Sequence, residues 1–381
     1  MSFKKKIIFL LISIILPCGV LLSQNSGEKK LRELDFIAFT SLENNSATVL
    51  EDAYKLLSES LKSKPNFYRI NAYTLLGIIN KDRGFYVTSL DFYLKALNAA
   101  ENLKDFPRQS ACLNNIGSVY QLQGNYSQAI DYFNQSLTIE EKLNQPIQKS
   151  IRFYNIGECY KDVDSLDLAL TYFNNSLLIE QKAKSNEGIV YAYLGIADVY
   201  IRIKRFTDAS IVIGTIEKKI QQGQIEEAII LHKLKGKLFL SSGNSSSALS
   251  EFQEGENLSL KYKNSTNLLE IVKLQIEVYE KSSDWQKAAS KYKQYVSLNE
   301  KMNSLHIKNQ LDDLNYRNEI TKKELEIELV QEERDLAKKN EKFEKNLRVY
   351  GLKITWFVIA LLVLSIGLIL YGVKKLTTSK E

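Results

Sequence analysis

The sequence predicts an all-α fold: a solenoid of stacked helix pairs, then a long charged helix, then one membrane-spanning helix. Three observations support this prediction. A helix-pair signature returns six times at intervals of 39 or 40 residues, four prolines are spread over 381 residues, and a 20-residue run near the end carries no charge. Because proline breaks helices, its scarcity permits helices along most of the chain.

Residues 1–23 resemble a secretory signal peptide. Lys4, Lys5 and Lys6 precede an apolar run, which ends at the helix-breaking Pro17. Two alternatives remain open, namely that this run stays as a membrane anchor or that Cys18 is lipidated. We expect the rest of the chain to be exported.

A degenerate first helical repeat is expected in residues 24–66, and six clear units follow in residues 67–303. Each unit has an anchor position, occupied in five of the six by a small residue. The anchors are Gly77, Gly117, Gly157, Ala197, Gly236 and Ile276.

Three further positions recur in each unit. Small residues follow the anchor by twelve positions, at Ser89, Ala129, Ala169, Ala209, Ala248 and Ala288. Large residues come four later, at Tyr93, Phe133, Phe173, Ile213, Phe252 and Tyr292. Facing small residues let two antiparallel helices approach closely, and the large residues fill the gap to the neighbouring pair. We expect the turn seven residues after each anchor, at Gly84, Gly124, Asp164, Lys204, Gly243 and Ser283.

This pattern resembles the tetratricopeptide repeat, in a variant with about 40 rather than 34 residues per unit. The resemblance covers roughly residues 31–300, and 125-NYSQAIDYFNQSL-137 is close to the family consensus. It implies a superhelix whose concave groove, lined by the first helix of each unit, binds a peptide or protein. Transferring the groove positions by register gives Asn71, Thr74, Ile78, Asn114, Ser118, Gln121, Tyr154, Glu158, Lys161, Tyr191, Leu194, Asp198, Lys233 and Lys237.

Residues 304–353 are expected to form a charged stalk helix. Leu329, Leu336, Phe343 and Tyr350 recur at seven-residue steps, as in a coiled coil. Glu333 and Asn340 occupy the partner positions of that heptad, where leucine would be expected. The sequence is compatible with a single solvated helix of roughly 70 Å and with a homodimer of parallel stalks.

Residues 354–373 carry no charge and are long enough to cross a hydrocarbon core of about 30 Å. Trp356 and Tyr371 fall near the two ends, where aromatic rings favour the membrane interface. Lys374 and Lys375 begin a tail, residues 374–381. We expect a bacterial inner-membrane protein that spans the membrane once, with periplasmic repeats and a cytoplasmic tail.

Composition and motifs argue against nucleic-acid binding and catalysis. Residues 25–373 carry 45 basic and 44 acidic side chains, which gives no basic footprint for a phosphate backbone. The two histidines are far apart, and no paired-cysteine, HExxH, P-loop or GxSxG motif is present. We expect no enzyme, metal site or cofactor. Cys112 and Cys159 are predicted to be small buried hydrophobes without a disulfide.

The order of signal, repeats, charged helix and span also resembles the periplasmic input half of bacterial envelope sensors, which lead to a cytoplasmic kinase or DNA-binding output. The favoured interpretation is a non-catalytic, membrane-anchored protein that presents a peptide-binding solenoid outside the cytoplasm. The alternative is the sensor subunit of a split or truncated regulator whose output lies on another chain.

Overall fold

The computed structural model describes residues 26–44, 46–63, 65–221 and 223–378. The expected signal peptide, residues 1–23, lies outside these ranges. The described residues form helices joined by short turns, and they contain no strand. The all-α prediction is therefore confirmed.

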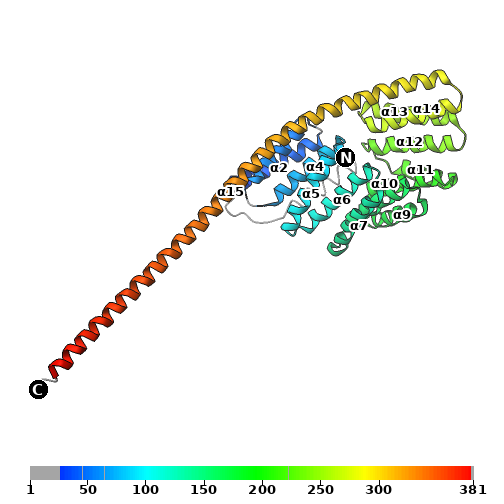
Figure 1. Cartoon of the computed structure of the whole chain (residues 1–381). Helices are drawn as coiled ribbons and strands as arrows, with labels where there is room; N and C mark the ends of the chain where they lie inside the picture. The colour runs from blue at the N-terminus through cyan, green and yellow to red at the C-terminus, as the bar shows by residue number, and fades with distance from the viewer. Residues whose placement is uncertain (1–25, 45, 64, 222, 379–381) are drawn as a thin grey trace. The chain divides into compact units, whose positions relative to one another are not determined.

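The helices pair as antiparallel hairpins, and each hairpin packs on the next to form a solenoid (Figure 1). The first pair, α2 (Ser26–Glu43) and α3 (Val49–Leu61), precedes the six predicted units. Those units are α4 (Phe67–Asp82) with α5 (Tyr86–Asn102), α6 (Phe106–Leu122) with α7 (Tyr126–Leu143), α8 (Pro146–Asp162) with α9 (Leu166–Ala183), α10 (Asn186–Arg202) with α11 (Phe206–Lys219), α12 (Ile225–Ser241) with α13 (Ser245–Lys261), and α14 (Ser265–Lys281) with the start of α15 (Trp285–Thr378).

The turn inside each unit lies where the sequence predicts it. All six predicted turn residues, from Gly84 to Ser283, have φ between 54° and 84°. This left-handed conformation ends a helix by letting the next backbone N–H reach back to a carbonyl five residues earlier. Asn125 N, for example, donates to Tyr120 O at 2.9 Å, and Arg205 N donates to Tyr200 O at 2.8 Å.

An aromatic ring packed on the anchor glycine joins the two helices of a unit. A Cβ added to Gly157 would lie 2.8 Å from the ring of Phe173, and one added to Gly77 would lie 2.4 Å from the ring of Tyr93. The large residue therefore occupies the space over the anchor of its own unit, as well as the gap to the next. Phe173 does both, since a Cβ on Gly195 of α10 would lie 2.7 Å from the same ring. Burying each ring contributes about 2–3 kcal/mol.

The two cysteines in the repeats are buried and free, as the sequence predicts. Burial raises the pKa of the Cys112 thiol and of the Cys159 thiol to about 12. Both therefore stay protonated at neutral pH and behave as apolar side chains.

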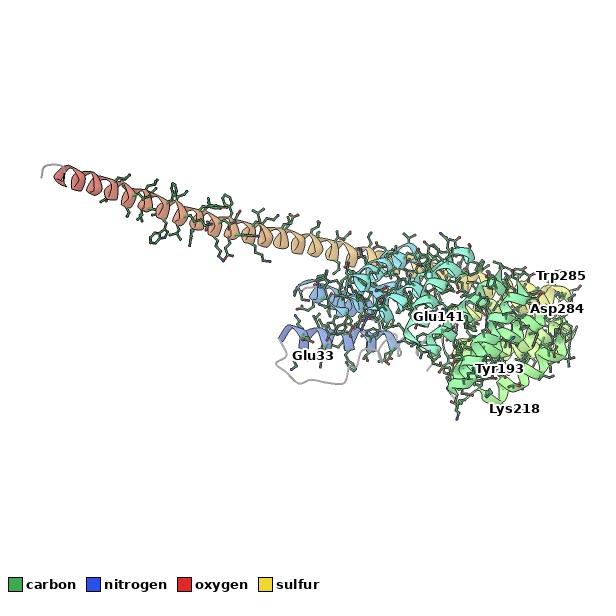
Figure 2. All side chains as sticks on the ribbon, turned by 90° about the horizontal axis from the view of Figure 1, so that it is seen from below. Glu33, Glu141, Tyr193, Lys218, Asp284 and Trp285 are labelled. Carbon is green, nitrogen blue, oxygen red and sulfur yellow. The ribbon has the colours of Figure 1, made fainter. Side chains whose placement is uncertain are left out.

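Helix α15 runs without a break for 94 residues, so the second helix of the sixth unit is also the start of the stalk. Asp284 and Trp285 lie where this helix begins, at one end of the solenoid (Figure 2). Its first turns pack on the repeats through Glu256 of α13, which accepts hydrogen bonds from Lys291 at 2.8 Å and from Gln294 at 2.6 Å.

The chain divides into two compact units, one ending at Asn318 and the other starting at Glu319. In the second unit, the heptad residues Leu329, Leu336, Phe343 and Tyr350 are 60–65 % exposed. Leu336–Leu368 is a segment long and apolar enough to cross a membrane by length and composition, and none of it is buried. It overlaps the predicted span 354–373.

A buried carboxylate connects the first hairpin to the repeats. Asp35 of α2 accepts hydrogen bonds from the amide of Asn71 of α4 at 3.0 and 3.2 Å, and Arg108 of α6 donates to the same amide at 3.2 Å. Burial raises the pKa of Asp35 to about 6, although Asn71 and Arg108 both act to lower it. Ionised Asp35 is therefore a cost to the fold at neutral pH.

We predict that Ala169→Arg unfolds the solenoid. Ala169 is 0 % exposed and packs with Phe173, Ile196 and Val199, so an arginine there would bury an unpaired charge. The expected loss is about 3 kcal/mol or more of unfolding free energy. Thermal melting followed by circular dichroism tests this, with Asn175→Arg on the exposed face of the same helix as control. Equal melting of both variants would contradict the repeat register.

We predict that Asp35→Asn removes a pH-dependent loss of stability. The folded pKa of about 6 lies above the ordinary value of 3.8, so the folded state binds the proton more tightly. The stabilisation of the fold by protonated Asp35 is fully present below pH 4 and is lost as the pH rises through 6. The free energy of unfolding falls by up to about 3 kcal/mol over this range.

The melting temperature of the wild type, measured relative to Asp35→Asn, should therefore fall between pH 4 and pH 7. Glu33→Gln, on the exposed side of α2, is the control. If the difference in melting temperature between the wild type and Asp35→Asn stays constant with pH, Asp35 does not titrate in this range.

Candidate functional site

The predicted groove residues lie along the first helices of the units. Helices α4, α6, α8, α10, α12 and α14 are successive neighbours in the solenoid. Because the first helices of stacked repeats run in the same direction, residues of equal register line up across them. We call this row the first-helix stripe.

At α4 the stripe is taken up by packing. Asn71 is held between Asp35 and Arg108, and Thr74 lies 4.0 Å from the sulfur of Cys112. Ile78 belongs to a core cluster with Tyr93 and is 6 % exposed. These three predicted groove residues are buried, and the contacts of Asn71 hold the first hairpin in place.

At α6 the stripe carries amides. The side-chain oxygen Oδ1 of Asn114 accepts a hydrogen bond at 2.8 Å from the side-chain amide of Asn155 on α8, the next first helix. Ser118 donates to the backbone carbonyl of Asn114 at 3.0 Å, and Gln121 is half-buried. The sequence analysis did not include Asn155 among the groove residues. Its position directly after the predicted groove residue Tyr154 on α8 could have indicated it.

At α8 and α10 the stripe is aromatic. The rings of Tyr154 and Tyr191 meet edge to face with centroids 6.1 Å apart, and Tyr154 also contacts Phe173. Leu194 lies in the core cluster of α10 with Tyr191. Burial raises the pKa of both phenols far above the ordinary value, and Glu226 and Glu227 raise that of Tyr191 further. Both tyrosines are therefore neutral.

Four of the predicted residues meet in one ion network. Lys161 pairs with Glu158 at 2.7 Å and with Asp198 at 3.4 Å, while Lys237 of α12 pairs with Asp198 at 3.1 Å. Arg202, which sequence reasoning missed, approaches Asp198 at 3.8 Å. Its position four residues after Asp198 could have indicated this contact, because residues four apart share a helix face.

The network keeps Asp198 ionised. Burial alone would raise its pKa, but Lys237, Lys161 and Arg202 hold that pKa well below its usual range. The charge of this carboxylate is therefore balanced by cations on three consecutive first helices.

A cavity of about 390 Å³ opens beside this network. Its charged lining consists of Asp198, Arg202, Lys204, Lys237 and Glu277, and the rest is mainly apolar. At α12 the remaining predicted residue, Lys233, pairs instead with Glu270 at 2.6 Å and donates to Asn267 at 3.2 Å. The structure thus brings Asp198 and Lys237 to the cavity and leaves Lys233 outside it.

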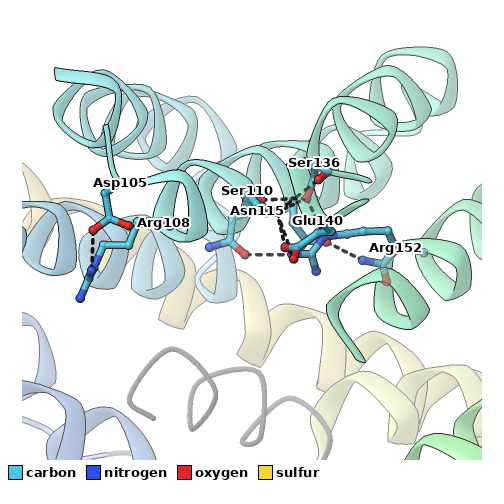
Figure 3. A network of polar contacts seen from close by, with 9 residues as sticks. Asp105, Arg108, Ser110, Asn115, Ser136, Glu140 and Arg152 are labelled. Carbon is cyan, nitrogen blue, oxygen red and sulfur yellow. Dashed lines mark hydrogen bonds and ion pairs between the residues drawn. The ribbon is translucent and has the colours of Figure 1, made fainter. Parts of the chain in front are cut away.

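A second polar cluster lies inside the middle units (Figure 3). Arg152 of α8 donates to Ser136 at 2.6 Å and pairs with Glu140 at 3.1 Å, and Ser110 also hydrogen-bonds to both of these α7 residues. Burial raises the pKa of Glu140. The same arrangement recurs one unit later as Ser150, Ser176 and Glu180. Because all these groups are buried, we assign the cluster to packing between units.

Among the described residues, no group of three or more histidine, cysteine, aspartate and glutamate side chains could hold a metal ion. The charged side chains of the stripe pair with one another instead. Asn114, Lys161 and Asp198 are buried, and the partly exposed Ser118, Glu158 and Lys237 are the polar groups of the row open to a ligand.

Comparisons with known proteins agree with this fold. Residues 68–142 match the tetratricopeptide repeat family. No curated protein matches the chain.

Several solved structures are similar to the chain. The apo form of RapI aligns with a TM-score of 0.61 at 12 % identity, covering 72 % of this chain and 99 % of its own. Aspartyl phosphate phosphatase F from Bacillus subtilis aligns at 0.60 and 15 % identity, covering 72 % and 71 %.

A Rap protein in complex with competence and sporulation factor aligns at 0.59 and 15 % identity, covering 74 % and 78 %. At these identities the likeness concerns the fold alone. The described chain is a tetratricopeptide-type helical repeat solenoid followed by a long helix.

Proposed function

We propose that this protein is a non-catalytic, membrane-anchored tetratricopeptide repeat protein that binds a peptide or protein in its first-helix stripe, outside the cytoplasm. The observation that carries the proposal is the central part of that stripe. Tyr154 and Tyr191 lie there between the amides of α6 and the ion network around Asp198. An extended peptide needs this combination of backbone hydrogen-bond partners, apolar contacts and charges.

A structure of similar fold supports this proposal. The Rap protein was solved in complex with competence and sporulation factor. A solenoid of this kind can therefore hold a separate factor. We infer the same general use of the solenoid here, with a different ligand, because the identity to that protein is only 15 %.

The anchoring part of the proposal rests on α15. The apolar stretch within Leu336–Leu368 is unburied, and such a surface is unfavourable in water. Lys353 and Trp356 lie near the start of the predicted span 354–373, where cationic and aromatic side chains favour the interface. We propose that this span sits in the bacterial inner membrane after export directed by residues 1–23, with the repeats in the periplasm.

The non-catalytic part concerns the charged groups of the stripe. Asp198, Glu158 and Lys161 pair with one another or with neighbouring cations, and the two tyrosines are kept neutral. One structure of similar fold is named a phosphatase, and that activity belongs to that protein. We propose binding without chemistry for this chain.

A second candidate function is signalling. The carboxylate of Glu256 accepts hydrogen bonds from α14 through Gln275 at 2.9 Å and from α15 through Lys291 and Gln294. A displacement of the last repeat would therefore reach α15 directly. This favours the sensor subunit of a regulator whose kinase or DNA-binding output lies on another chain.

We further propose that two stalks pair in parallel as a homodimer. Leu329, Leu336, Phe343 and Tyr350 form one exposed seam at heptad spacing. A span at the same end of each chain would orient two copies in the same direction. Asn340, at a partner position of the heptad, is a residue that fixes register in parallel dimers.

We predict that Tyr154→Ala weakens partner binding about tenfold or more while the solenoid stays folded. The substitution removes an aromatic contact at the centre of the stripe, where binding energy concentrates. In-cell photo-cross-linking from Gln121, with mass spectrometry of the captured protein, measures binding in wild type and variant. Tyr262→Ala, at an exposed aromatic residue at the end of α13, is the control.

Undiminished capture by Tyr154→Ala would contradict binding in the stripe. A captured kinase or transcription regulator would favour the signalling role. A structural envelope protein would favour the role of scaffold.

We predict that Leu336→Cys cross-links two copies of the chain in membrane vesicles. In a parallel dimer, seam residues face each other at a distance that a disulfide can bridge. Lys338→Cys, two residues on and away from the seam, is the matched control. Oxidation followed by non-reducing electrophoresis should give a dimer for the seam variant and little for the control, and equal yields would contradict the parallel pairing.

A further inference from the structure

We propose that the last repeat unit is covered by a second copy of this chain. The covering surface is a strip on the first turns of α15, formed by Trp285, Ala289, Tyr292 and Val296, which we call the end strip. The end strips of two copies pack on each other in parallel, so each copy caps the solenoid of the other. This inference rests on the parallel homodimer proposed above, and it adds a second contact surface and a role for that contact.

The end strip is exposed, whereas its counterparts in earlier units are covered. Trp285 is 64 % exposed, and Tyr292 and Val296 are 47 % and 50 % exposed. In the third unit the ring that corresponds to Tyr292 is that of Phe173, which is 0 % exposed and packs with Ile196 of the following first helix. In the sixth unit α15 continues as one helix, so no first helix follows it among the described residues. Because terminal repeats ordinarily present a polar outer face, this apolar end needs a cover.

The spacing of the end strip fits a second copy of the same helix. Its four residues follow one another at steps of four, three and four, which is the spacing of the a and d positions of a coiled coil. None of them carries a charge. Asn299 and Asn303 occupy the next two positions of this spacing, so the apolar surface ends there. Asn303 falls at an a position, where asparagine fixes the register of two paired helices.

The residues in and beside the end strip permit a parallel pair. Ala289 lies in its middle, where a small side chain lets two helices approach closely. In a parallel pair the e position of one helix faces the g position of the other. Lys293 of one copy therefore faces the uncharged Ala288 of the other, and Glu300 faces the uncharged Tyr295. No like charges meet across this contact.

The opposite face of α15 is already occupied by its own solenoid. Lys291 and Gln294 hydrogen-bond to Glu256, and Tyr295 and Leu298 pack on the core cluster of α14. A second copy on the end strip therefore adds to these contacts and displaces none of them. Since the stability of a terminal repeat depends on its neighbour, this cap should stabilise α14 and the start of α15.

The first test uses the full chain in membrane vesicles. Ala289→Cys places a thiol in the middle of the end strip, and Ser290→Cys, one residue on and outside the strip, is the matched control. Both positions are exposed, and both variants keep the same native cysteines, of which Cys112 and Cys159 are buried. After oxidation, non-reducing electrophoresis should show about fivefold or more disulfide-linked dimer for Ala289→Cys than for the control.

The second test measures the cap by hydrogen exchange of the α14 amides, with the full chain in detergent micelles. We expect this exchange to slow about fivefold or more as the protein concentration rises through the range where dimers form. Ala289→Glu should abolish the slowing, because two carboxylates would face each other in the dimer. Val87→Glu introduces the same charge at an exposed apolar residue of α5 and should retain the slowing.

Equal dimer yields from Ala289→Cys and Ser290→Cys, or exchange of α14 that does not depend on concentration, overturns the inference. If Leu336→Cys still cross-links in that case, the stalks pair as proposed and only the end-strip contact fails. A thiol of Ala289→Cys that is shielded from a maleimide reagent without forming a dimer would assign the strip to a different protein and would also overturn the inference. Binding in the first-helix stripe is tested separately by Tyr154→Ala.

Discussion

The close contact between an anchor glycine and an aromatic ring sixteen residues later determines the rest of this structure. In four of the six units the contact leaves no space for a Cβ, as at Gly117 and Gly236, where it would lie 2.7 and 2.3 Å from the ring. The two helices of a unit are therefore held at one separation and one register. Because Phe173 is also covered by Gly195 of the next unit, the same ring relates one pair to its neighbour. Repetition of this contact produces the solenoid.

A fixed stacking of units has a consequence for function. The same register positions come to lie in one row on the first helices, whatever residues occupy them. In the middle units the chemistry of this row changes from the amides of Asn114 and Asn155 to the tyrosine pair and then to the ions around Asp198. Asn114, Tyr191 and Asp198 are buried, so they also take part in packing. The scaffold thus supplies position, and the variable residues supply the specificity of binding.

Much of the fold could be predicted from the sequence because packing and turn requirements recur in every unit. The six residues predicted to form the turns do so, and all of them, including the non-glycine Asp164 and Lys204, adopt the left-handed conformation. Burial of the site residues could not be predicted the same way, since register gives the face of a helix but not what covers it. Asn71 and Ile78 share the predicted face and are nevertheless buried. Arg202 was missed because its contact with Asp198 belongs to an ion network formed by three helices.

The continuity of α15 has a similarly local cause. The second helices α5, α7, α9 and α13 are each followed by a residue with positive φ, at Lys104, Asn144, Lys184 and Lys263, which ends the helix and starts the next unit. No described residue of α15 has this conformation, so the helix continues through the charged segment into the apolar one. At the solenoid end, Glu256 joins α13 to this helix, so a rearrangement of the last repeats would have to move α15 or break those contacts.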